Sequence, residues 1–487
     1  MPESSARWKE LAEKFDNTDH AQIVERQVNH LDEQTLHSLY SGVGSLAYDP
    51  VPMLKMVLYQ YLKKHASPAQ WHEEAKLNEA MQWLGRGYQP ARRTWYDFRD
   101  RVGAVIDQLH EQLIHRAIDQ EHLDPSVGVQ DGTFFAACAS RHRMVNQGTL
   151  EKRQLILSQV IGGELSGDEE EIPKWVPPTL DGRLDLAGRI DKAAEILSTR
   201  IAQNATKPSG NRKDPAKIVV SLSDPEAPLG RDKLKVYRPL YTVQYMIEPT
   251  SNLVMSYCCE ASASDTGTLA PMIDLTQNIV GDRLRTVMAD AAYCTILDLQ
   301  DCMERNIELL APVQSNSFTE AKKKLNGSDS NNREQFAWDE AEQTYHCPAG
   351  HKLDYKGKER KSRHNGRSVV EHRYHCSPSH CEGCPLANGC VRNESRGRTI
   401  KRLEGQDLLD AQREKMDLEE VKNRYQLRGQ TVERGFADAK GNRQFHRYHG
   451  RGLSRARTET GLLVLAQNLL ILDRLQRNVV NTDQNET

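Results

Sequence analysis

The stretch RTVMADAAYCTILDLQDCMERNIELLAPV, residues 285–313, decides the fold class of this chain. Residues 285–289 are mostly apolar, and they predict a short strand that ends at Asp290. Residues 295–305 have the apolar spacing of a helix, and the run 307–313 predicts a second strand. Because strands that alternate with helices are typical of α/β proteins, the sequence predicts an α/β core.

More strands are predicted on the amino-terminal side of this stretch. Residues 126–135, SVGVQDGTFF, indicate a short strand that closes at Asp131 and Gly132. Residues 240–248 and 253–260 are two further strand-like runs, and the Pro-Thr-Ser-Asn between them predicts a hairpin. Residues 266–279 have helical spacing and complete an alternating pattern.

The chain is predicted to have four parts. Residues 1–120 are expected to form a helical domain, with an amphipathic stripe in residues 50–65. Residues 121–314 form the first part of the core, with a polar insertion at about 150–217. Residues 315–405 are a basic, cysteine-rich insertion with few apolar side chains, and residues 406–487 return to helix. The apolar segment 458–474 is expected to dock on the core.

Composition excludes several classes of protein. The chain has 487 residues, of which 38% are hydrophobic and 27% charged, as in a globular protein. Its longest nearly apolar stretch, residues 461–472, is far shorter than the ~20 residues that a bilayer requires. The first residues, MPESSARWKE, lack the apolar segment of a signal peptide. We therefore expect a cytoplasmic protein with no membrane association, in which the ten cysteines do not form a disulfide framework.

Positive charge is concentrated in the last third of the chain. The formal net charge is only −3, yet residues 351–402 and 421–457 each carry a net charge of +8. Two basic blocks of this size are typical of a surface that binds a polyanion, and nucleic acid is the expected partner. The alternative is a charged face that is simply solvated.

Three carboxylates are candidates for metal chemistry. Asp131 and Asp290 are each predicted at the end of a short strand and are followed by small residues, and strand ends are where ligand sites of α/β proteins collect. Glu433 lies among basic residues, about 20° from Lys440 on an ideal helix. Carboxylates brought together repel each other unless a divalent cation compensates them. The alternatives are that the aspartates form turns or cap helices, and that Glu433 pairs with Arg434 or Lys440.

Half of the ten cysteines lie within 44 residues, inside the basic insertion. Thiolates in a region too polar to form its own core are typical of a structural zinc site. The expected ligands are Cys347, Cys381, Cys384 and Cys390, with Cys376 as the substitute. The alternative is a set of free thiols.

Several motifs, taken in order, resemble the DDE transposases of bacterial insertion sequences, of the IS4/IS5 kind and most like the IS1182 group. The resemblance covers most of the chain. Its elements are the segment 41–101, Asp131-Gly132-Thr133, Asp224-Pro225-Glu226-Ala227, Ala289-Asp290-Ala291-Ala292-Tyr293, and Tyr425-x2-Arg428-x4-Glu433-x6-Lys440. The last block has one more residue between Arg428 and Glu433 than the IS4 form. The group also has a similar cysteine pattern between its second Asp and its Glu.

The resemblance implies a fold and an activity. The fold would be an α/β (α+β) RNase H-like core with an all-helical amino-terminal domain and the cysteine-rich insertion. Asp131, Asp290 and Glu433 would bind two Mg²⁺ or Mn²⁺ ions, for DNA cleavage and strand transfer at the ends of an insertion sequence. The residues implied to contact DNA are Tyr425, Arg428, Lys440, Arg443, Arg447 and Arg451.

The partners follow from the same resemblance. They would be double-stranded DNA, as terminal inverted repeats and as target, with residues 1–120 helping to recognise the repeats. Pairing of two DNA ends is consistent with a homodimer, and such an enzyme would be associated with the nucleoid. The alternative is a zinc-containing DNA-binding protein that derives from a transposase and lacks catalytic activity.

Overall fold

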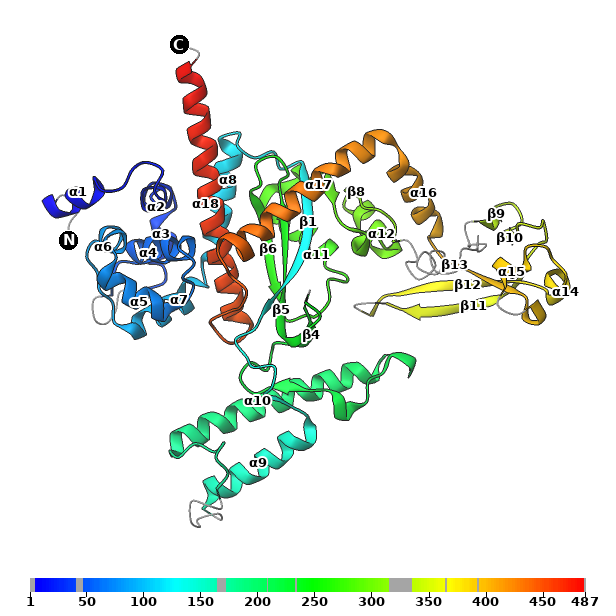
Figure 1. Ribbon diagram of the computed structural model, residues 1–487, viewed down its shortest axis with the longest axis horizontal. Helices are drawn as coiled ribbons and strands as arrows, with labels where there is room; N and C mark the ends of the chain where they lie inside the picture. The colour runs from blue at the N-terminus through cyan, green and yellow to red at the C-terminus, as the bar shows by residue number, and fades with distance from the viewer. Residues whose placement is uncertain are drawn as a thin grey trace. The chain divides into compact units, whose positions relative to one another are not determined.

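The computed structural model describes residues 5–40, 47–163, 172–207, 209–232, 234–314, 335–363, 366–391 and 394–485 (Figure 1). The chain divides into two compact units. Unit 1 consists of Met1–Asp265, Met272–Leu284 and Arg428–Thr487, and unit 2 of Thr266–Pro271 and Arg285–Leu427. No helix within the described ranges is both long enough and apolar enough to cross a membrane.

Unit 1 begins with helices, which are the only regular structure among described residues 5–119. Side chains of Asp19, Asp32 and Asp49 cap three of them by accepting hydrogen bonds from backbone N–H groups in the first turn. One helix, α4, is buried along its whole length. The helices are α1 (Ala6–Ala12), α2 (His20–Val28), α3 (Glu33–His37), α4 (Pro50–Leu62), α5 (Pro68–Leu77), α6 (Glu79–Leu84), α7 (Arg92–Val102) and α8 (Ile106–Asp119).

The strands of unit 1 form an antiparallel arrangement around β5. Strand β1 (Val127–Ala136) pairs with β5 (Tyr237–Ile247), and Asp131 lies opposite Tyr245. The hairpin predicted from the sequence is present, because β5 pairs with β6 (Val254–Glu260). Glu248 holds its turn by accepting hydrogen bonds from the N–H groups of Thr250 and Ser251. The remaining strands are short: β2 (Met144–Val145), β3 (Val220–Ser221) and β4 (Leu229–Arg231), of which β4 lies beside β5.

Helix α18 (Leu453–Asn485) links the amino-terminal helices to these strands (Figure 1, red). It packs on α2, α4, α7, α8 and β6. Asn468 binds the backbone of β6, since its Oδ1 accepts from the N–H of Val254 at 3.0 Å and its Nδ2 donates to the same residue's carbonyl at 2.9 Å. The predicted docking of segment 458–474 on the strands is therefore found within unit 1.

The insertion at about 150–217 has a core of its own. Helices α9 (Gln147–Gly162) and α10 (Leu180–Ala205) pack against each other, as Figure 1 shows. Short 3₁₀ turns η1 (Ser209–Asn211) and η2 (Pro215–Lys217) follow. The buried residues between the helices are apolar: Leu150, Leu157, Val160, Ile190, Ala193 and Leu197. Helix α11 (Leu269–Val280) and the 3₁₀ turn η3 (Gly281–Arg283) come later in the chain.

Unit 2 contains the strand–helix–strand predicted for residues 285–313. Strands β7 (Thr286–Met288) and β8 (Glu308–Leu310) are parallel, and α12 (Ile296–Glu304) connects them. A capping box between Thr295 and Asp298 begins α12. Helix α16 (Gln406–Asp417) covers this motif, because Gln412 donates hydrogen bonds to the carbonyls of Leu309 and Ala311.

The described part of the cysteine-rich region is mostly β structure. It contains β9 (Ala337–Asp339) paired with β10 (Thr344–His346), and a sheet of β11 (Asp354–Ser362), β12 (Ser368–Cys376) and β13 (Arg398–Leu403). Two short helices, α14 (Pro378–Cys381) and α15 (Ala387–Cys390), and the turn η7 (Glu394–Arg396) complete it. Trp338, Tyr345 and Tyr374 are in mutual contact and form a small aromatic core. The low apolar content of this region does not predict such a core.

Candidate active site

One face of β1 carries Asp131, Thr133 and Phe135, because alternate side chains of a strand point to the same side. Two cations from the carboxyl-terminal part of unit 1 meet this face. Arg428 places its Nη2 3.5 Å from Oδ1 of Asp131. Lys440 donates a hydrogen bond to Oγ1 of Thr133, and its Nζ lies 5.2 Å from the centre of the Phe135 ring. The carboxylate of Asp131 therefore lies in a positively charged environment.

Asp131 does not close its strand, which corrects the prediction from the sequence. Strand β1 continues in register with β5 through Phe135 and Ala136, so Asp-Gly is not a turn here. The glycine leaves room for a neighbouring side chain on the other side of the strand. A Cβ at Gly132 would lie 2.3 Å from the side-chain amide nitrogen of Gln244, which is fully buried beneath it.

The segment between Arg428 and Lys440 contains Glu433, on α17 (Glu419–Ala437). The side chain of Glu433 lies outside what the structure describes. Residues Asp438–Asn442 form a π-helical turn, so the ideal-helix angle of 20° between Glu433 and Lys440 does not apply. Turns of this kind are frequent at functional sites, and here one directs Lys440 to β1.

In unit 2, Asp290 follows β7 and caps the 3₁₀ turn η4 (Ala291–Tyr293). Its Oδ1 accepts a hydrogen bond from the N–H of Ala292 at 2.7 Å, so this aspartate caps the turn. The residue before it is bound by α17, because the hydroxyl of Tyr425 donates to the carbonyl of Ala289 at 3.0 Å. Tyr425 thus supports the backbone that carries Asp290.

The neighbouring Arg424 fastens the same helix to β7 and β8. Its Nη2 lies 2.8 Å from Oε2 of Glu308, on β8, and 3.3 Å from Oγ1 of Thr286, on β7. Neither contact could be predicted from the sequence, because Arg424 is one of many basic residues in its block. The first half of α17 is therefore held against the strand ends near Asp290.

The three remaining arginines predicted to contact DNA have different surroundings. Arg443 is buried and donates hydrogen bonds to Asp438 and to the carbonyl of Leu62. Arg447 is exposed, and its guanidinium donates to the carbonyls of Ala137 and Ala139 just beyond β1. Arg451 is exposed.

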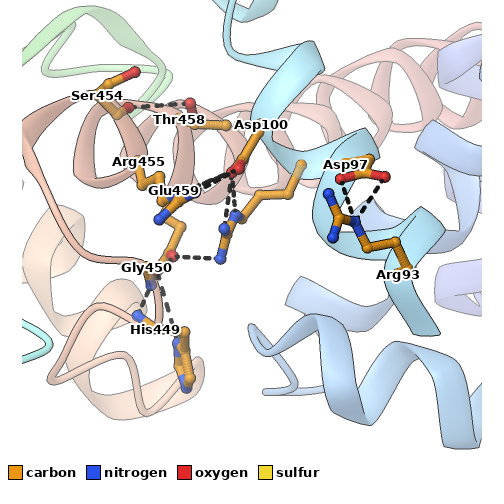
Figure 2. A network of polar contacts seen from close by, with 10 residues as sticks. Arg93, Asp97, Asp100, His449, Gly450, Ser454, Arg455, Thr458 and Glu459 are labelled. Atoms are coloured by element: carbon orange, nitrogen blue, oxygen red, sulfur yellow. Dashed lines mark hydrogen bonds and ion pairs between the residues drawn. The ribbon is translucent and has the colours of Figure 1, made fainter. Parts of the chain in front are cut away.

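A buried carboxylate holds the loop between Lys440 and α18, as Figure 2 shows. Glu459 accepts hydrogen bonds from the backbone N–H groups of His449, at 2.8 Å, and Gly450, at 2.6 Å. Nη1 of Arg99, from α7, lies 3.8 Å from the same carboxylate. The loop that carries Arg447 and Arg451 is therefore held in place by Glu459, which forms an ion pair with Arg99 inside unit 1.

The five clustered cysteines come together in unit 2. Cys347, Cys376, Cys381, Cys384 and Cys390 all line one cavity of about 20 Å³, which has room for a single water-sized particle. Burial, together with the neighbouring thiols of Cys381 and Cys347, raises the pKa of Cys376 to about 12. Cys376, the substitute ligand in the sequence prediction, is thus in direct contact with two of the predicted ligands.

The turn after Cys347 is shaped around its sulfur. The backbone N–H of His351 donates to Sγ of Cys347 at 3.3 Å, and the N–H of Gly350 donates to the carbonyl of Cys347 at 2.7 Å. Gly350 has a φ of +86°, which favours glycine. The N–H of His351 is thus directed at the sulfur of a predicted zinc ligand.

A further group of possible metal ligands, which sequence reasoning missed, lies on the β9–β10 hairpin. Asp339, Glu342 and His346 place their ligand atoms within 4.8 Å of one another. Lys352 already neutralises this group in part, since its Nζ lies 2.8 Å from Oε2 of Glu342. Acidic side chains at an exposed hairpin commonly gather without an ion, and we assign no metal to them.

Comparison with known proteins identifies the class. Residues 9–101 match the family model described as Transposase domain (DUF772), and residues 346–472 match the one described as Transposase DDE domain. These two matches support a DDE transposase, an enzyme that cleaves DNA and transfers its strands. DNA is therefore its partner, and a divalent metal is implied for its chemistry.

Other comparisons add little. No curated protein matches the chain. Among solved structures, the chain is similar to a piggyBac transposase synaptic complex with hairpin DNA, determined by cryo-electron microscopy. The identity is 8%, the match covers 96% of this chain and 76% of that chain, and the TM-score is 0.34. A TM-score of this size carries no argument about the fold.

Proposed function

We propose that this transposase cuts and rejoins the DNA ends of its own mobile element, with Asp131, Asp290 and Glu433 as the ligands of two Mg²⁺ or Mn²⁺ ions. The observation that carries the proposal is the pairing of Asp131 with Arg428 at 3.5 Å on one face of β1. A carboxylate on a face that also carries cationic side chains can bind a divalent cation and a phosphate together, because such ions prefer hard oxygen ligands and keep positions for substrate phosphates. Asp290, at the end of a strand in unit 2, offers the same chemistry.

The proposed reaction has two steps that balance without an additional reagent. Water attacks the phosphorus at the element's end, and the P–O bond to the 3′ oxygen breaks to leave a free 3′-hydroxyl. This hydroxyl then attacks a phosphate of the target DNA, and its proton leaves as the target strand is broken. Two bound metal ions would activate the attacking oxygen and stabilise the leaving one.

The residues of this chain would supply charge and position. Arg428 and Lys440 are placed beside Asp131 on β1, where they would neutralise the negative charge that builds up on the phosphate during each step. Tyr425 would keep Asp290 in position through the carbonyl of Ala289. Arg447 and Arg451 would contact phosphates further along the strand, whereas Arg443 is bound inside the protein and would position the turn that carries Lys440.

The finer features of fold and partners belong to the same proposal. The antiparallel strands of unit 1 and the strand–helix–strand of unit 2 are consistent with an RNase H-like core. The DNA would be the terminal inverted repeats of the element and its target, with residues 1–120 helping to recognise the repeats. Pairing of two ends would take place in a homodimer, at the nucleoid in the cytoplasm.

The cysteine cluster would hold one structural zinc ion. The donor set fits, because five thiols line one cavity of about 20 Å³ and two of them contact Cys376. We therefore place Cys376 among the ligands, together with Cys347 and Cys381. Either Cys384 or Cys390 would be the fourth. The ion would stabilise a region whose own core is small.

A strand-transfer assay tests the catalytic assignment. Purified protein is incubated with duplexes that carry the element's end sequence, in Mg²⁺ or Mn²⁺, and joined products are measured. Asp131→Asn and Glu433→Gln should each lower joining by at least about 10³-fold, because charge stabilisation of this kind supplies several kcal/mol. End binding should persist in both variants. Joining at wild-type rates by either variant would remove that residue from the site.

A further inference from the structure

Unit 1 contains a second basic feature, a cavity of about 740 Å³ that lies apart from the Asp131 face of β1. It is formed by the start of α2, the last turn of α17, the π-helical turn and the second half of α18. The charged side chains that line it are Arg434, Arg443, Arg474, Arg477 and Asp438. Four arginines thus face one carboxylate among the described lining residues.

Two of these arginines already form ion pairs with carboxylates of the protein. Nε of Arg443 lies 3.0 Å from Oδ2 of Asp438, and Nε of Arg477 lies 2.8 Å from Oδ2 of Asp473. Arg434 and Arg474 are exposed, and neither guanidinium has an ion pair or a hydrogen bond within the described part of the chain. The cavity therefore presents two arginine side chains whose charge is not compensated by the described protein.

The other lining side chains indicate what kind of ligand fits. Asn252, Asn442 and Gln467 offer amide donors, and guanidinium groups bind phosphate oxygens through paired N–H bonds. His20 supplies the only aromatic ring among the described lining residues, and no Phe, Tyr or Trp side chain is there to form a broad surface on which bases could stack. This combination favours the phosphodiester backbone of a nucleic acid over its bases.

The place of Arg434 in the chain suggests which part of the DNA would bind. Arg434 directly follows Glu433 on α17, and Gly435, the next residue, is packed on Ile247 of β5. The last turn of this helix is therefore fixed on the strands. A backbone bound in the cavity would run close to the proposed metal site, so the inference rests on the proposed function.

We propose that this cavity binds two backbone phosphates of the transposon-end DNA beside the cut, through Arg434 and Arg474. The contact is independent of DNA sequence and positions the strand for cleavage. It adds to the phosphate contacts assigned to the β1 side, because its residues come from the other flank of α17 and from α18.

The test compares salt dependence of DNA binding in the full-length protein. The Arg434→Gln/Arg474→Gln double variant is matched with Lys152→Gln/Lys217→Gln, which removes two exposed charges in the insertion outside the cavity. Fluorescence anisotropy with a labelled end duplex gives the affinity over a range of KCl concentrations. Each lost phosphate contact lowers the slope of log affinity against log salt by about 0.9, so the double variant should lose about 1.8.

Three outcomes are decisive. A slope lower by about 1.8 in the cavity variant, with the control unchanged, supports the proposal. Equal slopes in cavity variant and wild type overturn it. Equal slopes together with lost thermal stabilisation by inorganic phosphate also overturn it, since the cavity then binds a free anion. Asp131→Asn separates the two proposals. If this variant cleaves DNA at the wild-type rate while the cavity variant shows the reduced slope, only the catalytic assignment fails.

Discussion

Replacement of Glu459 by glutamine should loosen the loop that precedes α18. The carboxylate is 0% exposed and accepts two backbone hydrogen bonds, from His449 and Gly450. Glutamine keeps one acceptor oxygen, but its NH₂ group would then face an N–H donor. The change also removes the negative charge 3.8 Å from Arg99, whose side chain is 3% exposed.

The magnitude follows from these two losses. A buried N–H left without a partner costs about 1–3 kcal/mol. Breaking one side of a buried ion pair costs about 3–5 kcal/mol, and the lower end applies here because Arg99 keeps its bonds to Asp100. We expect Glu459→Gln to destabilise the closed loop by about 4 kcal/mol, the sum of the two lower values, which corresponds to roughly 10³-fold faster amide exchange.

Hydrogen exchange measured by mass spectrometry on the peptide that spans residues 446–452 is the direct assay. Arg455→Gln is the matched control, because it breaks the ion pair between Arg455 and Asp100 in the same network. The side chain of Arg455 in this pair is 44% exposed. Exposed pairs contribute at most about 1 kcal/mol, so the control should accelerate exchange less than tenfold. Similar exchange in Glu459→Gln and the control would refute the role given to the buried carboxylate.

Three other predictions concern catalysis, metal and pH. Tyr425→Phe removes one hydrogen bond to Ala289, so it should slow cleavage by about 3–10-fold in a single-turnover assay while the Kd for end DNA stays within twofold. Metal analysis should find about one zinc per chain, sharply reduced in Cys376→Ser and unchanged in Cys302→Ser; a folded wild type without zinc would exclude the site. Burial lowers the pKa of His110 from 6.5 to about 4, so the unfolded chain binds a proton in this range and the folded chain does not. The free energy of unfolding should fall by about 3 kcal/mol between pH 6.5 and pH 4, and urea titrations of His110→Gln should show a smaller fall.

The sequence predicted those elements that depend on local patterns. The hairpin of β5 and β6, the motif β7–α12–β8 and the helix α4 all follow from residue spacing within a short window. The error at Asp131 has a physical cause, because Asp-Gly is typical of turns but Gly132 is needed here for the side chain of Gln244. Packing between distant segments leaves no trace in local spacing.

The candidate site likewise has features that follow from the sequence and features that depend on contacts between distant segments. The resemblance led to the acidic residues and to the cysteines, but the contacts between them could not be read from spacing. The pairs Asp131–Arg428 and Thr133–Lys440 join segments far apart in the sequence. The sequence predicts Cys376 only as a substitute ligand, whereas strand β12 brings it to the cavity.

The position of α18 has a consequence for how the protein reaches its native state. Arg26 and Asp473, 447 positions apart, form a partly buried hydrogen bond, and the backbone of β6 is bound by Asn468 of the same helix. The ribosome therefore makes α2, α4, α8 and the strands long before the segment that they enclose. Contacts at such separations slow folding, and until α18 emerges its apolar partners remain open to water and to chaperones. Assembly of unit 1, and with it any transposition activity, should begin only once synthesis has passed this helix.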